Sequence, residues 1–70
     1  MPAHIFVMDH SNYDICLRRG GTQYRLNDKV MQIRNDYDKE VFNGDIGTIC
    51  KVDMQERELT VDFDGRKVIY

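Results

Sequence analysis

Apolar and polar residues alternate most regularly in RELTVDFDGRKVIY, at residues 57–70. Leu59, Val61 and Phe63 occupy every second position, which is the period of a β-strand with one buried face. The Asp64–Gly65 pair that follows favours a two-residue turn in which both residues adopt positive φ. The pattern therefore predicts a β-hairpin over this segment.

The turn also fixes the register of the predicted hairpin. The residues expected to face each other are Phe63 and Arg66, Val61 and Val68, and Leu59 and Tyr70. The last two pairs join apolar residues, as a hairpin with one buried face requires. A shift of one residue would move every apolar side chain to the opposite face, so the register is strongly specified.

Two further segments predict strands. KVMQIR at residues 29–34 lies between turn-forming Asn-Asp pairs, and its pattern leaves open whether Val30 or its neighbours Met31 and Ile33 face the interior. DIGTICKVD at residues 45–53 follows a turn-forming Asn-Gly pair, and Gly47 predicts a β-bulge or close backbone packing. In this second segment a two-residue period gives one shared face, with Cys50 expected to be buried. The residues on that face are Ile46, Cys50 and Val52.

The first third of the chain is less regular. IFVM at residues 5–8 predicts a short strand, and SNYD at 11–14 a turn rich in side-chain hydrogen bonders. RRGGTQYRL at 18–26 predicts a glycine turn followed by an extended piece. No segment shows a sustained helical period, and several short strands separated by turns indicate a mostly β domain folded as a small twisted barrel.

Composition limits the function classes. Seventy residues with 41% hydrophobic and 31% charged content indicate one small globular domain. No run approaches a membrane span or a signal-peptide core, so we expect a cytoplasmic setting in which Cys16 and Cys50 are reduced thiols. A formal net charge of −2 does not favour strong independent binding of nucleic acid, which usually requires a basic surface.

The acidic stretch NDYDKEVFNGDIG at residues 35–47 is a candidate calcium loop. An EF-hand needs glycine at position six and a bidentate glutamate at position twelve. Counted from Asp36, these positions hold Val41 and Gly47. A zinc site is equally poorly matched, because the four candidate ligands lack paired near-neighbour spacing. These candidates are His4, His10, Cys16 and Cys50. We expect no metal site.

Enzyme motifs are absent as well. The sequence contains no GxxxxGK[ST], GxGxxG, HExxH or GxSxG. Cys50 in a predicted apolar strand lacks a recognisable histidine base, which a cysteine nucleophile needs. We expect no catalytic residue and no cofactor in this chain.

The segment LNDKVMQIRNDYDKEVFNGDIGTICKVD, followed by ELTVDFDGRKVIY, resembles the SH3-like insertion in the second motor domain of RecD-like DNA helicases, such as the exodeoxyribonuclease V alpha chain. The matching features are the DKVMQ strand, the RNDYDKEVFNGDIG connection and the VDFDGR hairpin. The resemblance covers about residues 24–70 and implies an SH3-like barrel there. Residues 1–23 lie outside it and are expected to be an N-terminal extension or a first strand.

The resemblance also implies a role. The domain would assist single-stranded DNA engagement and translocation within a full-length helicase, beside neighbouring motor domains of the same polypeptide. ATP and magnesium would bind to the parent helicase outside this chain, and DNA repair and recombination are the processes that such a parent serves.

In this interpretation residues 35–47 form a shaped loop, in which Asp and Asn side chains bond to nearby backbone groups. Arg34 and Lys39 become candidates for phosphate contact, and Tyr37 for stacking on a base. Phe42 is expected to pack in the core rather than to stack. The candidate nucleic-acid-binding residues are Arg34, Asn35, Tyr37, Lys39 and Asn43.

Two alternatives remain open. NGDIGTICKVD also resembles the KOW-type segment of ribosome- and RNA-associated SH3-like barrels, although only over about a dozen residues with a generic Gly-Asp-x-Gly pattern. A protein-interaction domain is the other alternative, but the chain has no tryptophan and shows no obvious aromatic groove for polyproline.

Overall fold

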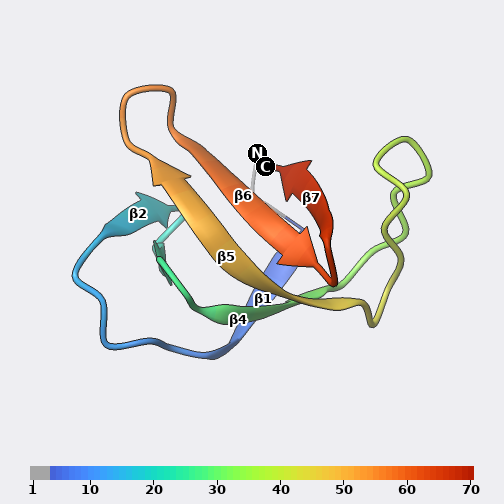
Figure 1. Cartoon of the computed structure of the whole chain (residues 1–70), viewed down its shortest axis with the longest axis horizontal. Helices are drawn as coiled ribbons and strands as arrows, with labels where there is room; N and C mark the ends of the chain where they lie inside the picture. Colours follow the sequence, from blue (N-terminus) through green and yellow to red (C-terminus); the bar gives the residue numbers. More distant parts are fainter. Residues whose placement is uncertain (1–3) are drawn as a thin grey trace.

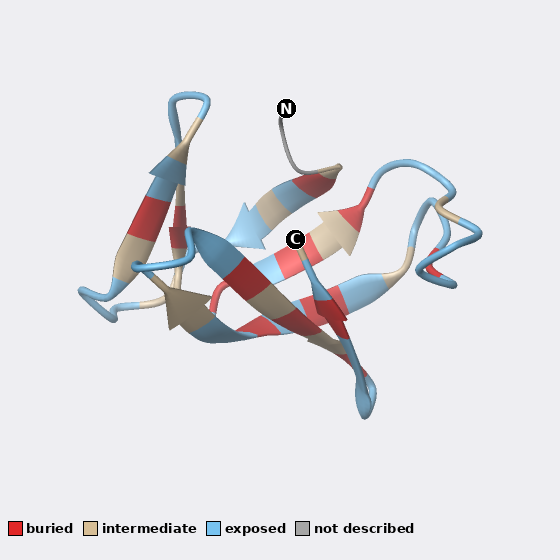
Figure 2. Cartoon of the chain, turned by 90° about the horizontal axis from the view of Figure 1, so that it is seen from above, coloured by how far each residue is buried: buried red, intermediate tan, exposed pale blue. Residues whose placement is uncertain are grey.

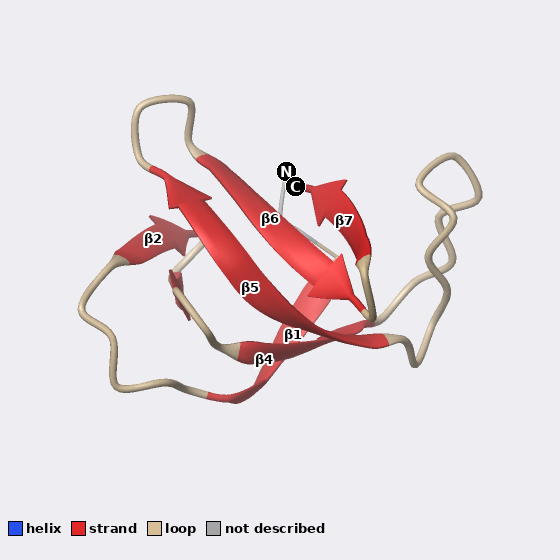
Figure 3. Cartoon of the chain, in the orientation of Figure 1, coloured by secondary structure: helices blue, strands red, loops and turns tan. Residues whose placement is uncertain are grey.

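The computed structural model describes residues 4–70, and every regular element in this part of the chain is a β-strand (Figure 3). This confirms the predicted mostly β fold and is compatible with a small SH3-like barrel. The seven strands are β1 (Ile5–Asp9), β2 (Cys16–Arg19), β3 (Thr22–Arg25), β4 (Lys29–Gln32), β5 (Ile46–Asp53), β6 (Glu58–Phe63) and β7 (Arg66–Ile69). No helix in the described part is long and apolar enough to cross a membrane.

The strands form two antiparallel sheets. A curved five-stranded sheet has the order β1-β4-β5-β6-β7, and β2 and β3 form a separate two-stranded ribbon (Figure 1). The ribbon contacts the sheet through β5. Its inward side chains, Leu17 and Tyr24, face each other in the register and are 0% and 4% exposed. The ribbon therefore closes one side of the core.

The core contains side chains from all seven strands and from the connection between β4 and β5. Its side chains alternate with exposed ones along the strands, as half-buried β-strands require (Figure 2). The buried apolar residues are Ile5, Leu17, Tyr24, Val30, Val41, Ile49, Leu59, Val61, Phe63 and Val68. Ile5 and Leu17, both before position 24, thus belong to the core, and β3 runs across the expected boundary at residues 23 and 24.

The β6–β7 hairpin has the predicted register. Val61 pairs with Val68 and Phe63 with Arg66, and reciprocal backbone hydrogen bonds of 3.0 and 2.8 Å join Leu59 to Tyr70. Asp64 and Gly65 at the turn have φ values of 56° and 96°. The alternation of apolar residues and the turn chemistry were therefore sufficient to define this element.

The prediction that Cys50 is buried is wrong. The register between β5 and β6 shifts between Ile49 and Lys51, which leaves Cys50 as the extra residue of a β-bulge. Ile49 is fully buried, whereas Cys50 is exposed and Ile46 is 47% exposed. Gly47 and Ile49 take the inward positions of β5, so Ile46 and Cys50 lie on its outer face. The bulge then returns the half-buried Val52 to the inner face.

Close backbone packing at Gly47 is confirmed. A Cβ atom at this position would lie 2.7 Å from Val61 Cγ1 and 2.8 Å from the Asp62 carbonyl oxygen. In β4, the inward residues are Val30 and the polar Gln32, while Ile33 just beyond the strand is 46% exposed. The pattern of apolar residues could not decide this face, because the strand buries a glutamine.

Candidate nucleic-acid interface

The connection between β4 and β5, residues 33–45, extends away from the barrel at one end of the molecule (Figure 1). An isolated antiparallel bridge joins Asp36 to Val41, with backbone hydrogen bonds of 2.7 and 3.1 Å. Val41 is fully buried and belongs to the core cluster. The projecting loop is therefore anchored to the barrel by one apolar side chain and stiffened by its own backbone pairing.

Short polar side chains cap the turns of this loop, as the sequence predicted. Asn35 Oδ1 accepts a hydrogen bond from the Asn43 amide at 2.9 Å, which closes the base of the loop. Asp36 Oδ1 accepts from the Lys39 amide at 3.1 Å, and Asp45 Oδ2 from the Phe42 amide at 3.0 Å. These local hydrogen bonds give the loop its shape.

Two aromatic rings project from the loop. Tyr37 is 73% exposed and Phe42 is 42% exposed, and their ring centroids lie 5.7 Å apart in an edge-to-face arrangement. The expectation that Phe42 packs in the core is wrong. Neighbouring residues of an extended segment point to opposite sides, and here Val41 takes the inward position.

The two cationic candidates differ in their surroundings. Arg34 is exposed, and its side chain has no ion-pair partner among residues 4–70. The Lys39 ammonium instead donates a hydrogen bond to the Ile69 carbonyl and lies 4.7 Å from the centre of the Tyr70 ring. Lys39 is therefore directed toward β7 and the end of the chain.

The loop as a whole is acidic. Its carboxylates outnumber its cations, and one of them, Glu40, lies 3.6 Å from Arg66 at the start of β7. The acidic residues are Asp36, Asp38, Glu40 and Asp45, against Arg34 and Lys39. This balance weakens the attraction of the loop for phosphate groups and leaves the aromatic rings as its main binding feature.

A polar contact that the sequence did not reveal supports the base of the loop. The Tyr70 hydroxyl donates to Gln32 Oε1, and Gln32 Nε2 donates to the Arg34 carbonyl at 2.7 Å. Burial, together with the negative charges of Asp36 and Asp45, raises the pKa of Tyr70 from 10.0 to about 12. The hydroxyl therefore stays protonated, as this hydrogen bond requires.

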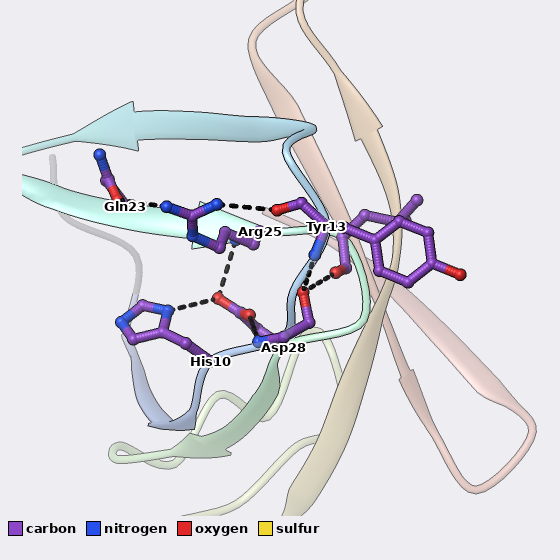
Figure 4. A network of polar contacts seen from close by, with 7 residues as sticks. His10, Tyr13, Gln23, Arg25 and Asp28 are labelled. Atoms are coloured by element: carbon purple, nitrogen blue, oxygen red, sulfur yellow. Dashed lines mark hydrogen bonds and ion pairs between the residues drawn. The ribbon is translucent and has the colours of Figure 1, made fainter.

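A second network surrounds the fully buried Asp28 (Figure 4). One carboxylate oxygen accepts from the Ser11 amide at 2.6 Å, and the other accepts from the Arg25 amide at 2.8 Å and contacts His10 Nδ1 at 3.0 Å. The network fastens the segment between β1 and β2 to the turn before β4. The contact of His10 with an aspartate 18 residues away could not be read from the sequence.

No group of three or more His, Cys, Asp or Glu side chains among residues 4–70 is placed to hold a metal ion. Cys16 is half-buried and Cys50 is exposed, and both are free thiols. The five candidate residues are all exposed, but the structure joins only two of them directly, through the contact between Asn35 and Asn43.

Comparison with known proteins identifies a protein family and a relative. Residues 7–63 match the family model described as "ATP-dependent RecD-like DNA helicase SH3 domain". This match begins at residue 7, whereas the resemblance noted in the sequence begins at about residue 24. The chain is 39% identical to the ATP-dependent RecD2 DNA helicase of Deinococcus radiodurans, over 87% of this chain but only 10% of that relative. No solved structure matches.

Proposed function

Because this chain belongs to the SH3 domain family of ATP-dependent RecD-like DNA helicases, we propose that it is an accessory domain which helps such a helicase to engage single-stranded DNA during translocation. The chain spans about one tenth of the relative that it matches. In this proposal ATP and magnesium bind elsewhere in the longer enzyme, neighbouring motor domains are the protein partners, and the enzyme works on cytoplasmic DNA in repair and recombination.

The observation that carries the proposal is the exposed Tyr37 ring on a stiffened, projecting loop. Single strands offer unpaired bases, and stacking on an aromatic ring contributes about 1–3 kcal/mol per base without sequence preference. Tyr37 is 73% exposed, and its neighbour Phe42 restricts one edge of the ring. A ring held in this way can receive a base with little loss of conformational freedom.

The other candidate residues take supporting roles. Arg34, which has no carboxylate partner in the described chain, would contact a phosphate group next to the stacked base. Lys39 would do the same after leaving the Ile69 carbonyl. Asn35 and Asn43 would hold the loop in shape rather than touch DNA, because the Asn35 side chain accepts a hydrogen bond from the Asn43 backbone amide.

The test is a triple variant, Arg34→Ala, Tyr37→Ala and Lys39→Ala, in the full-length helicase. We expect slower unwinding and weaker binding of single strands, with DNA-independent ATP hydrolysis unchanged. Other parts of the enzyme hold the strand, so local contacts act at high effective concentration. A matched control replaces three exposed residues of the barrel, Lys29, Lys67 and Ile69, with alanine. If the two variants unwind DNA equally well, the loop is only structural.

A further inference from the structure

A strongly basic surface lies at the opposite end of the molecule from the loop. Residues 15–26 (ICLRRGGTQYRL) contain three arginines and no acidic residue, although the whole chain has a net charge of −2. They form the β2–β3 ribbon. Arg18 pairs with Gln23 and Cys16 with Arg25, so Arg18 and Arg25 lie on the face opposite the buried Leu17 and Tyr24. The ribbon is thus apolar inside and basic outside.

A fourth arginine joins this surface from another hairpin. Arg57 lies in the turn between β5 and β6, which approaches the end of β2 (Figure 1). Its guanidinium donates to the Arg18 carbonyl at 2.9 Å, and the Arg19 guanidinium donates to the Arg57 carbonyl. These reciprocal contacts hold the tips of the two hairpins together. We call Arg18, Arg19, Arg25 and Arg57 the arginine surface.

Glu56 and Glu58 flank Arg57 in the sequence, but no arginine of this surface forms an ion pair among residues 4–70. Residues 4–70 contain two ion pairs, His10–Asp28 and Arg66–Glu40, and neither includes an arginine of this surface. These arginines donate hydrogen bonds to backbone carbonyls and to Gln23 Oε1, which orient the guanidinium groups without cancelling their charge. Guanidinium forks with free donors match phosphate oxygens well.

An exposed aromatic ring accompanies the arginines. Tyr13 is 50% exposed, and its carbonyl accepts a hydrogen bond of 2.8 Å from Arg25 Nη1. Figure 4 shows the Tyr13 ring pointing away from the network around Asp28. Basic side chains beside an exposed aromatic ring are the combination with which proteins track a single strand, because the cations meet the backbone and the ring meets a base.

We infer that the arginine surface binds the phosphate backbone of single-stranded DNA and that Tyr13 stacks on one of its bases. The inference rests on the proposed function, since it assumes that the domain meets a single strand. It places the phosphate contacts on the β2–β3 ribbon, at the far end of the molecule from the acidic loop. The two surfaces can therefore be tested separately.

The experiment is a nuclear magnetic resonance titration of the ¹⁵N-labelled chain with oligodeoxythymidylate of about 12 nucleotides, a length within the site sizes of small single-strand-binding domains. Low salt and roughly 1 mM oligonucleotide make even weak non-specific binding visible. We expect shifts in the amide signals of residues 13–25 and 57 and in the arginine Nε signals of the same surface.

Two double variants with the same loss of charge complete the test. Arg18→Gln with Arg57→Gln should weaken binding several-fold and lower the slope of log affinity against log salt by about 1.4, which corresponds to two lost phosphate contacts. Lys29→Gln with Lys67→Gln changes exposed lysines on the outer face of the large sheet and should leave the affinity within about twofold. Thermal unfolding checks that both variants fold.

Three outcomes would contradict the inference, and each has a different meaning. Equal weakening by both double variants would mean that only net charge matters and would overturn the inference. Shifts confined to residues 34–43 would also overturn it, while the proposed function would stand with the loop as its site. An absence of shifts throughout would exclude a strand-binding arginine surface, and the proposed function would then be decided by unwinding in the full-length helicase.

Discussion

Gly47 of β5 packs so tightly against β6 that only a residue without a side chain fits there. A Cβ atom would approach Val61 Cγ1 to 2.7 Å, the Asp62 carbonyl oxygen to 2.8 Å and Phe63 Cδ1 to 2.9 Å. The backbone oxygen cannot move without disturbing the pairing of β5 with β6. The glycine is therefore required by packing rather than by a special φ angle.

We expect Gly47→Ala to lower the free energy of unfolding by about 1–3 kcal/mol, the usual cost of overpacking a core. Urea denaturation monitored by circular dichroism measures the change. Ile46→Val serves as the control, because Ile46 is 47% exposed and such a surface change should stay within about 0.5 kcal/mol. Equal stability of Gly47→Ala and the wild type would show that β5 and β6 can separate freely at this point.

At the scale of elements, Tyr70 links three parts of the structure. Its backbone pairs with Leu59 of β6, its hydroxyl donates to the buried Gln32 of β4, and its ring lies under the Lys39 ammonium of the loop. The side-chain amide of Gln32 in turn donates a hydrogen bond to the Arg34 carbonyl. The end of the β6–β7 hairpin therefore holds the base of the loop in place.

This link should depend on pH. The pKa of Tyr70 is about 12 in the folded chain against an ordinary value of 10.0, so the unfolded chain releases this proton first as pH rises. The stabilisation is fully present below pH 10 and is lost progressively toward pH 12. Tyr70→Phe leaves Gln32 Oε1 without its donor and should cost about 1–3 kcal/mol near neutral pH.

The measurement is the difference in free energy of unfolding between wild type and Tyr70→Phe, determined in urea from pH 8 to pH 12, which spans both values of the Tyr70 pKa. The difference should shrink above pH 10, because only the wild type carries this ionisable hydroxyl. Tyr37→Phe, which changes a 73% exposed ring, should show no such trend. A constant difference across the range would contradict the role given to the hydroxyl.

At the scale of the whole molecule, a row of apolar side chains crosses the outer face of the large sheet. Phe6 of β1 faces Met31 of β4, which in turn faces Ile46 of β5. Phe6 is 59% and Ile46 47% exposed. The proposed function gives the domain neighbouring motor domains as partners, and on that proposal we expect this row to pack against one of them.

Phe6→Ser with Ile46→Ser should lower the melting temperature of the full-length helicase but change the stability of the isolated chain by about 0.5 kcal/mol or less. The reason is that an exposed apolar side chain contributes to stability only when the neighbouring domain removes it from water. Met54→Ser with Ile69→Ser provides exposed control positions away from the row. An unchanged melting temperature of the full-length helicase would exclude this face as the docking surface.

Local patterns in the sequence determined the β6–β7 hairpin and the polar caps of the loop. Alternating apolar residues, Asp64–Gly65 and the short side chains of Asn35, Asp36 and Asp45 each act within a few residues, where backbone sterics and local hydrogen bonds decide the conformation. The family resemblance predicted the SH3-like barrel as a whole.

The tertiary structure decided which residues face the core in β4 and in the loop. Gln32 is buried against Tyr70, 38 residues away, and Val41 takes the inward position beside Phe42 because it joins a core formed by side chains from all seven strands. The arginine surface likewise joins β2 and β3 to a turn almost forty residues later. Such contacts are set by packing between distant segments, and no local pattern encodes them.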